Sequence, residues 1–133
     1  MSEIINAIDA TQEIVAEVSP APPTFERQTS ASDLKARLDW GEPAFTIIDV
    51  RDRESFNNKR IQGAIHYTAD ELVERVRQTL EPNRDIYIYA DEEGAAINAA
   101  SRLDQAGYKK VAILEDGIRA WLAASGVVEG RQA

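Results

Sequence analysis

A strand, a tight loop and a helix follow one another between Arg84 and Gly107, and this stretch could position a reactive group. Ile86 to Tyr89 is a short apolar run rich in β-forming residues, which predicts a strand buried on both faces. Residues 95–103 place alanine, isoleucine and leucine at helical spacing, and Gly107 stands where a left-handed C-terminal cap belongs. A strand that turns sharply into a helix aims backbone N–H groups at one point, which favours an anion-binding site.

The loop that joins this strand to this helix already carries anions. Asp91, Glu92 and Glu93 occupy it ahead of Gly94, and the eleven residues after the strand include no Lys, Arg, Cys, Ser or Thr. Nucleophilic catalysis at the loop is therefore nearly excluded. The favoured interpretation is self-capping, in which carboxylates in the first turn satisfy free N–H groups and the helix dipole, each contributing about 0.3–1 kcal/mol. The alternative is a binding role for an acidic loop.

The segment from Tyr89 to Trp121 resembles the active-site loop and C-terminal portion of rhodanese-like domains. In that family a cysteine opens the loop, and an arginine and a serine or threonine close it. Ala90 stands at the cysteine position, Ala95 at the arginine position and Ala96 at the hydroxyl position. The resemblance therefore implies a domain without catalytic residues, so that neither sulfurtransferase nor phosphatase activity is expected.

Residues 49–64 carry a second match to the same family. It consists of an Asp-Val-Arg box, a later aromatic residue and an Ile-x-Gly-Ala turn, which here are Asp49, Val50, Arg51, Phe56, Ile61, Gly63 and Ala64. The chain departs from the family's pattern at Ser55, Lys59, Arg60 and Gln62. In the family this box is largely architectural, so we expect Arg51 to form a structural salt bridge with Asp49 or Glu54.

Composition limits the possible partners. The chain has 133 residues, a net charge of −8 and no cysteine. The acidic charge argues against nucleic acid and anionic membranes as partners. Without cysteine there can be no disulfide, thiolate metal site or persulfide, and we expect neither a cofactor nor a bound metal.

No apolar run approaches the ~20 residues of a membrane helix, and no secretory signal is visible, so a cytoplasmic protein is the default.

Residues 1–24 differ from the rest because they carry four acidic residues and no basic one. Ile4, Ile8, Val15 and Val18 lie near one face of a possible helix, and a proline-rich linker follows at 19–23. The favoured interpretation is a flexible extension. The alternative is a tethered helix that docks on a partner or on its own domain. Residues 25–126 are then a single domain, and 127–133 a frayed C-terminal tail.

The remaining segments alternate between strands and helices. Strands are predicted at 25–29, 44–48, 64–67 and 111–114, and helices begin at Ser30 and at the capping box 68–71. We interpret the lone His66 as a structural residue. The alternation predicts a parallel sheet covered on both faces, and the resemblance implies an α/β fold with a doubly wound five-stranded sheet flanked by helices.

In such sheets ligands bind beyond the carboxyl ends of the strands. These ends lead here into three acidic segments, 49–54, 91–93 and 115–116. We therefore expect a catalytically inactive module that binds a protein with a basic patch through the loop 91–94. Its supporting rim would be Asp49, Arg51, Asp52, Glu54, Glu115 and Asp116. The alternatives are an enzyme or sensor that holds a divalent cation in this mouth, and a scaffold for a partner-binding N-terminal helix.

Overall fold

The computed structural model describes residues 27–39 and 44–132. Seven strands and five helices follow one another in this part of the chain. In order they are β1 (Gln28–Thr29), α2 (Ala31–Asp39), β2 (Phe45–Asp49), α3 (Arg53–Asn58), β3 (Arg60–Ile61), β4 (Ile65–His66), α4 (Leu72–Thr79), β5 (Asp85–Tyr89), α5 (Glu93–Gln105), β6 (Val111–Leu114), α6 (Gly117–Ala123) and β7 (Val128–Glu129).

Five of the strands form one parallel sheet in the order β1-β6-β5-β2-β4. The central strand β5 pairs with β2 through Ile48 opposite Ile88 and with β6 through Ile113 opposite Ile88. The chain thus starts at one edge of the sheet, crosses to the other and returns. This confirms the five-stranded, doubly wound α/β fold expected from the sequence.

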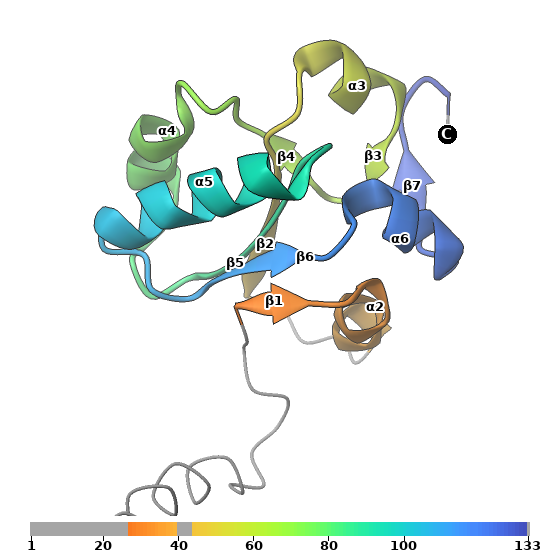
Figure 1. Ribbon diagram of the computed structural model, residues 1–133, viewed down its shortest axis with the longest axis horizontal. Coiled ribbons are helices and arrows are strands. Elements are labelled where there is room, and N and C mark those ends of the chain that lie inside the picture. Colours follow the sequence, from red (N-terminus) through yellow and green to blue (C-terminus); the bar gives the residue numbers. More distant parts are fainter. Residues whose placement is uncertain (1–26, 40–43, 133) are drawn as a thin grey trace, which may run out of the picture.

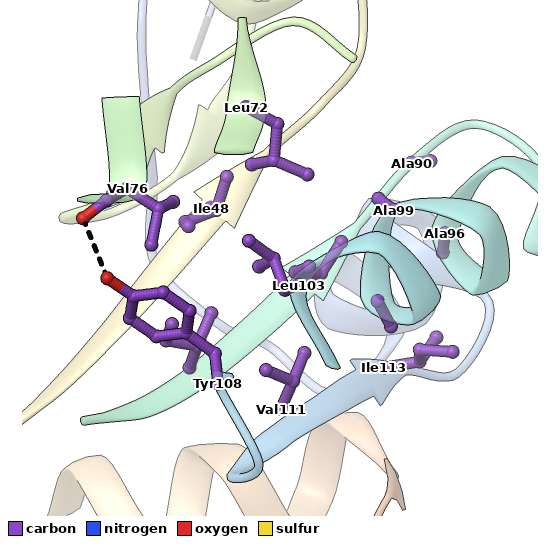
Figure 2. Packing of buried hydrophobic residues seen from close by; sticks show 13 residues of the cluster. Ile48, Leu72, Val76, Ala90, Ala96, Ala99, Leu103, Tyr108, Val111 and Ile113 are labelled. Atoms are coloured by element: carbon purple, nitrogen blue, oxygen red, sulfur yellow. Dashed lines mark hydrogen bonds between the residues drawn. The ribbon is translucent and has the colours of Figure 1, made fainter. Parts of the chain in front are cut away.

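Helices cover both faces of the sheet (Figure 1). Because side chains of a strand alternate, Ile86 and Ile88 of β5 face α4 and α5, while Tyr87 and Tyr89 face α2 and α6. Figure 2 shows the first of these two layers, in which Leu103 of α5 packs above the strands. The continuous apolar run of β5 is therefore explained by burial on both sides.

Local sequence signals position the helix ends. The Ser30 hydroxyl accepts from the Asp33 N–H at 3.1 Å, so the predicted cap of α2 is present. The Glu71 carboxylate accepts from the Thr68 N–H at 3.1 Å, but this pair lies in the turn before α4. The helix begins at Leu72, and its N-cap residue Glu71 makes no side-chain capping hydrogen bond, so the predicted capping box does not open the helix. At the end of α5, Gly107 has φ +104°, which makes it the left-handed residue that the sequence predicted.

The C-terminal segment differs from the expected frayed tail. Strand β7 pairs antiparallel with β3, and beyond it Arg131 N–H donates to the Asn57 carbonyl at 2.9 Å. Gly130 lies so close to α3 that a Cβ there would be 2.7 Å from the Asn58 carbonyl oxygen. Residues 127–132 therefore form a strap over the end of α3, held by contacts that no local pattern in the sequence could reveal.

Some predictions lie outside the described residues. The extension 1–24 with its proline-rich linker and Phe25 at the start of the first predicted strand belong to this group. Within the described part, helix α2 buries Leu34 completely, while Leu38 is 39% exposed. None of the helices described there is long and apolar enough to cross a membrane.

Candidate functional site

The carboxyl ends of β2, β5 and β6 lie side by side, because these strands are neighbours in the sheet. The three loops that follow them therefore open at the same edge. Their exposed acidic residues are Asp52, Glu54, Asp91, Glu92, Glu93, Glu115 and Asp116. We call this surface the acidic mouth; it also includes Arg53 at the start of α3. The structure thus brings together the three acidic segments that the sequence predicted to converge.

Ala90, the residue at the expected cysteine position, is 9% exposed and packs in the core. It lies beside Ala96 and Ala99 of α5 (Figure 2). On its other side is Gly117, where φ is +54° and a Cβ would stand 2.7 Å from the Ala90 carbonyl oxygen. Ala95 is exposed, so the position of the expected arginine faces solvent.

The acidic loop does not cap its own helix as expected. Glu92 occupies the N-cap position of α5 with φ −126° and ψ 145°, and its side chain makes no capping hydrogen bond. Glu93 accepts instead from the Gln28 side-chain amide of β1 at 3.2 Å. Asp91 and Glu92 form neither a hydrogen bond nor an ion pair with another described side chain. Their stabilising effect on the helix is therefore limited to the dipole.

Asp49 and Arg51 form a buried ion pair beneath the mouth. The Arg51 Nη2 atom is 2.7 Å from Asp49 Oδ2, and Arg51 also donates to the Lys59 carbonyl at 2.6 Å. Asp49 is 0% and Arg51 9% exposed, so the two residues expected at the rim lie inside the domain. This confirms the structural salt bridge, with Asp49 and not Glu54 as the partner of Arg51.

Electrostatics links this ion pair to the loop above it. Burial by itself lowers the pKa of Arg51, but the hydrogen bonds and charge of Asp49 outweigh burial, and the pKa is raised. The negative charge of Asp91 contributes in the same direction. Arg51 therefore stays positively charged and offsets part of the negative potential of the mouth from below.

Tyr89 is a member of this network that sequence reasoning missed. Its hydroxyl accepts from the Ile61 N–H at 3.1 Å, and its ring lies 5.3 Å from the Arg51 guanidinium carbon. Burial, followed by the charge of Asp49, raises the pKa of the Tyr89 hydroxyl. The residue sits in an apolar run, and nothing in that run signals that its hydroxyl has a partner on β3.

His66 joins the same network from the end of β4. Its Nε2 atom donates to the Arg51 carbonyl at 2.6 Å, and its ring stacks on Phe56 at a centroid distance of 4.9 Å. Its Nδ1 atom is buried and has no hydrogen-bond partner among the described residues. These contacts give His66 the structural position that its sequence context predicted.

Two acidic residues of the mouth have local roles. The Asp52 carboxylate caps α3 by accepting from the Ser55 N–H at 2.7 Å, and this bond lowers the pKa of Asp52. Asp116 stands at the N-cap of α6, but its side chain makes no capping hydrogen bond. It has φ 59°, a left-handed conformation that aspartate tolerates better than most residues other than glycine.

The mouth therefore offers negative potential and exposed carboxylate acceptors, over a floor that carries no nucleophile. It can attract cations, but anionic sulfur donors would be repelled, since one carboxylate at ~4 Å costs a unit charge about 4 kcal/mol at an effective dielectric of 20. Within residues 27–39 and 44–132, no three acidic or histidine side chains are grouped so as to hold a metal ion.

Comparison with known proteins identifies relatives over most of the chain. The rhodanese-like domain model matches residues 30–124. The rhodanese-like domain of the Alr3790 protein from Anabaena sp., solved by solution NMR, is 44% identical with a TM-score of 0.77, and the match covers 80% of this chain and 81% of that one.

Two curated proteins are also similar. The putative sulfur carrier protein YrkF of Bacillus subtilis is 30% identical over 71% of this chain, and the match spans 50% of its own length. The thiosulfate sulfurtransferase GlpE of Shewanella oneidensis is 32% identical over 56% of this chain and 73% of its length. The extent of the family match, together with the fold and the Asp49–Arg51 box, shows that the chain belongs to the rhodanese-like domain family.

Proposed function

We propose that this chain is a catalytically inactive rhodanese-like domain that binds a protein partner through its acidic mouth. The observation that carries the proposal is the state of the loop carboxylates. Asp91 and Glu92 are exposed and neither cap α5 nor pair with a cation in the described part of the chain. They lie at the edge of the sheet where α/β folds bind their ligands. Carboxylates that form no hydrogen bond or ion pair within the described domain are available to a partner.

The chemistry of the loop supports a non-catalytic role. Sulfur transfer in the family uses a cysteine thiolate, and Ala90 cannot carry a persulfide. The loop also lacks the arginine and the hydroxyl residue that accompany the cysteine, because Ala95 and Ala96 replace them. All three functional positions hold alanine, and the loop is negatively charged. Reinstating a single residue would therefore not recreate an anion-binding site.

The partner that fits the mouth presents lysine or arginine side chains. Opposite charges across such a rim act mainly on the association rate, and salt screens them beyond a Debye length of about 8 Å at physiological ionic strength. We place the protein in the cytoplasm and propose that its partner is neither nucleic acid nor a membrane surface. Its function would then be regulatory, through occupation of the partner's basic patch.

The test is a triple substitution that removes the charge and keeps the shape: Asp91→Asn, Glu92→Gln and Glu93→Gln. Partners are captured from cells with the parent protein, and their binding to the variant is measured at low and high salt. We expect weaker binding, chiefly through slower association, and a smaller effect of salt than in the parent.

The matched control removes the same charge elsewhere. Asp39→Asn, Glu74→Gln and Glu81→Gln change one exposed aspartate and two exposed glutamates on or just after helices α2 and α4. This control should bind as the parent does. Unchanged binding of every captured partner to the loop variant would leave Asp91 to Glu93 without a recognition role.

A further inference from the structure

A groove runs between helix α5 and the edge strand β1, beside the acidic mouth: its lining residue Gln28 donates to Glu93 of the mouth at 3.2 Å. Its cavity volume is about 270 Å³. Helix α5 forms one wall, strand β1 forms the other, and β6 lies between them. The residues that line it are Arg27, Gln28, Ile97, Ala100, Ser101, Asp104, Val111 and Ile113.

The groove offers apolar surface that the described part of the chain does not cover. Ile97 is 48% exposed, although α5 is otherwise an ordinary amphipathic helix with buried alanines on its inner side. Beneath it, Val111 and Ile113 form an apolar floor. A segment that covers this apolar surface removes it from water, and the hydrophobic effect favours its binding.

The position at which the chain enters the described region indicates the occupant. Arg27, the first described residue, is itself part of the groove wall. Eight residues, 19–26, separate it from the apolar stripe that ends at Val18, and eight residues can span at most about 26–29 Å. A helix formed by 1–18 would be about 27 Å long and could lie along α5.

Charge favours the same occupant. At the Arg27 end of the groove, Asp104 is shared by Arg27 at 3.2 Å and Lys109 at 3.4 Å, so two cations face a single carboxylate. Residues 1–24 contain acidic residues and no basic one, and Glu13 and Glu17 stand nearest the linker. A helix whose Val18 end lies beside Arg27 brings these two glutamates to that positive end.

We propose that residues 1–18 form an amphipathic helix that docks in this groove through Ile4, Ile8, Val15 and Val18. The sequence pattern by itself favours a flexible extension, and the groove is the observation that favours docking on the chain's own domain. Tethering helps, because the linker keeps the segment within reach of the groove, so even a weak contact is populated. The inference is independent of the acidic mouth and of the function proposed for it.

The chain contains no cysteine, so one introduced cysteine can carry a nitroxide spin label without any background. Ala10→Cys places the label away from the stripe. We expect loss of amide NMR intensity at Ile97, Ala100 and Ser101 when the label is paramagnetic. Val127 serves as the reference, since it is 57% exposed but lies next to β7 and outside the groove. Intensity at Val127 should stay unchanged.

Two matched double variants test the docking face. Ile4→Asp with Ile8→Asp places charge on the stripe and should restore intensity in the groove. Ile5→Asp with Ile14→Asp adds the same charge off the stripe and should leave the loss in place. These four positions precede the described domain, so the fold of 27–132 serves as an internal check in the same spectra.

A mixed sample identifies the source of the segment. Spin-labelled chain without isotope is added to isotope-labelled chain without spin label, and we expect no loss in the groove. Loss that appears in this mixture as well would assign the groove to a second copy and overturn the proposal. Full intensity at Ile97 in the labelled chain, or equal loss at Val127, would overturn it as well.

Discussion

Ala90 decides what the loop can do at the scale of single residues. Its methyl group belongs to the core layer under α5, and its carbonyl oxygen lies against Gly117 at the start of α6. A thiol at this position would fit only as a nearly buried group below three carboxylates. Both burial and like charge raise the pKa of a thiol and so oppose formation of the thiolate.

We therefore predict that Ala90→Cys alone does not restore sulfur transfer. The introduced thiol would face Asp91, Glu92 and Glu93, and no arginine at position 95 would stabilise a bound anion. The measurement is mass spectrometry of the variant after incubation with thiosulfate, with the parent as blank. A stable persulfide on the single variant would mean that the geometry of the loop outweighs its charge.

The buried ion pair leads to a second prediction at this scale. Arg51→Met leaves the fully buried Asp49 carboxylate without its counter-charge, which should lower the free energy of unfolding by about 3–5 kcal/mol. Urea denaturation of the variant measures this loss. Arg53→Met, at an exposed position two residues away, is the matched control and should change stability by no more than about 0.5 kcal/mol. Equal effects of the two substitutions would contradict the structural role of Arg51.

At the scale of elements, helix α3 depends on its N-terminal cap. The hydrogen bond from the Ser55 N–H lowers the pKa of Asp52 in the folded state. A lowered folded-state pKa means that the stabilisation is complete above the unfolded pKa and is lost as pH falls through the folded one. Acid should therefore weaken the start of α3 through this residue.

Asp52→Asn tests this dependence, because an amide oxygen can still accept the hydrogen bond but does not titrate. We predict that the loss of unfolding free energy between neutral pH and about pH 3 is smaller in the variant than in the parent. Asp33→Asn, in the first turn of α2, removes the same charge and is the control. A variant as acid-sensitive as the parent would show that the cap does not depend on ionised Asp52.

The elements also show where sequence reasoning succeeds and where it fails. The strand that ends at Tyr89 and the cap at Ser30 were predictable, since each depends on residues close in sequence. The strap 127–132 was not, because its hydrogen bonds reach residues of α3 and β3 far along the chain. Self-capping of α5 failed for a geometric reason: glutamate, one methylene longer than aspartate, is not among the preferred N-cap residues.

In the candidate site, too, some features were predictable from the sequence and others were not. The convergence of the acidic segments followed from the parallel sheet alone. The burial of Asp49 and Arg51, the part played by the Tyr89 hydroxyl and the approach of Gly117 to Ala90 did not. Each of these depends on how β3, β4 and α6 pack around the end of β5, and local periodicity contains no such information.

At the scale of the whole molecule, the chain keeps the rhodanese-like fold and lacks a thiol. We predict no thiosulfate:cyanide sulfurtransferase activity and no phosphatase activity, since both would need a nucleophile at the loop. The assay compares the purified chain with a heat-inactivated sample. Turnover clearly above that blank would require a nucleophile other than a cysteine and would overturn the inactive assignment.

The strap also has a consequence for the order in which the molecule folds. Arg60 and Glu129, which pair across β3 and β7, are 69 positions apart, so closing this contact costs more chain entropy than joining neighbouring elements. We therefore expect the small sheet to gain its partners after the neighbouring elements β5, α5 and β6 have assembled. By the same argument we expect the strap to release first on unfolding. The amides of Gln62, Arg131 and Gln132, whose hydrogen bonds join the strap to the rest of the domain, should then exchange with solvent sooner than those of β5.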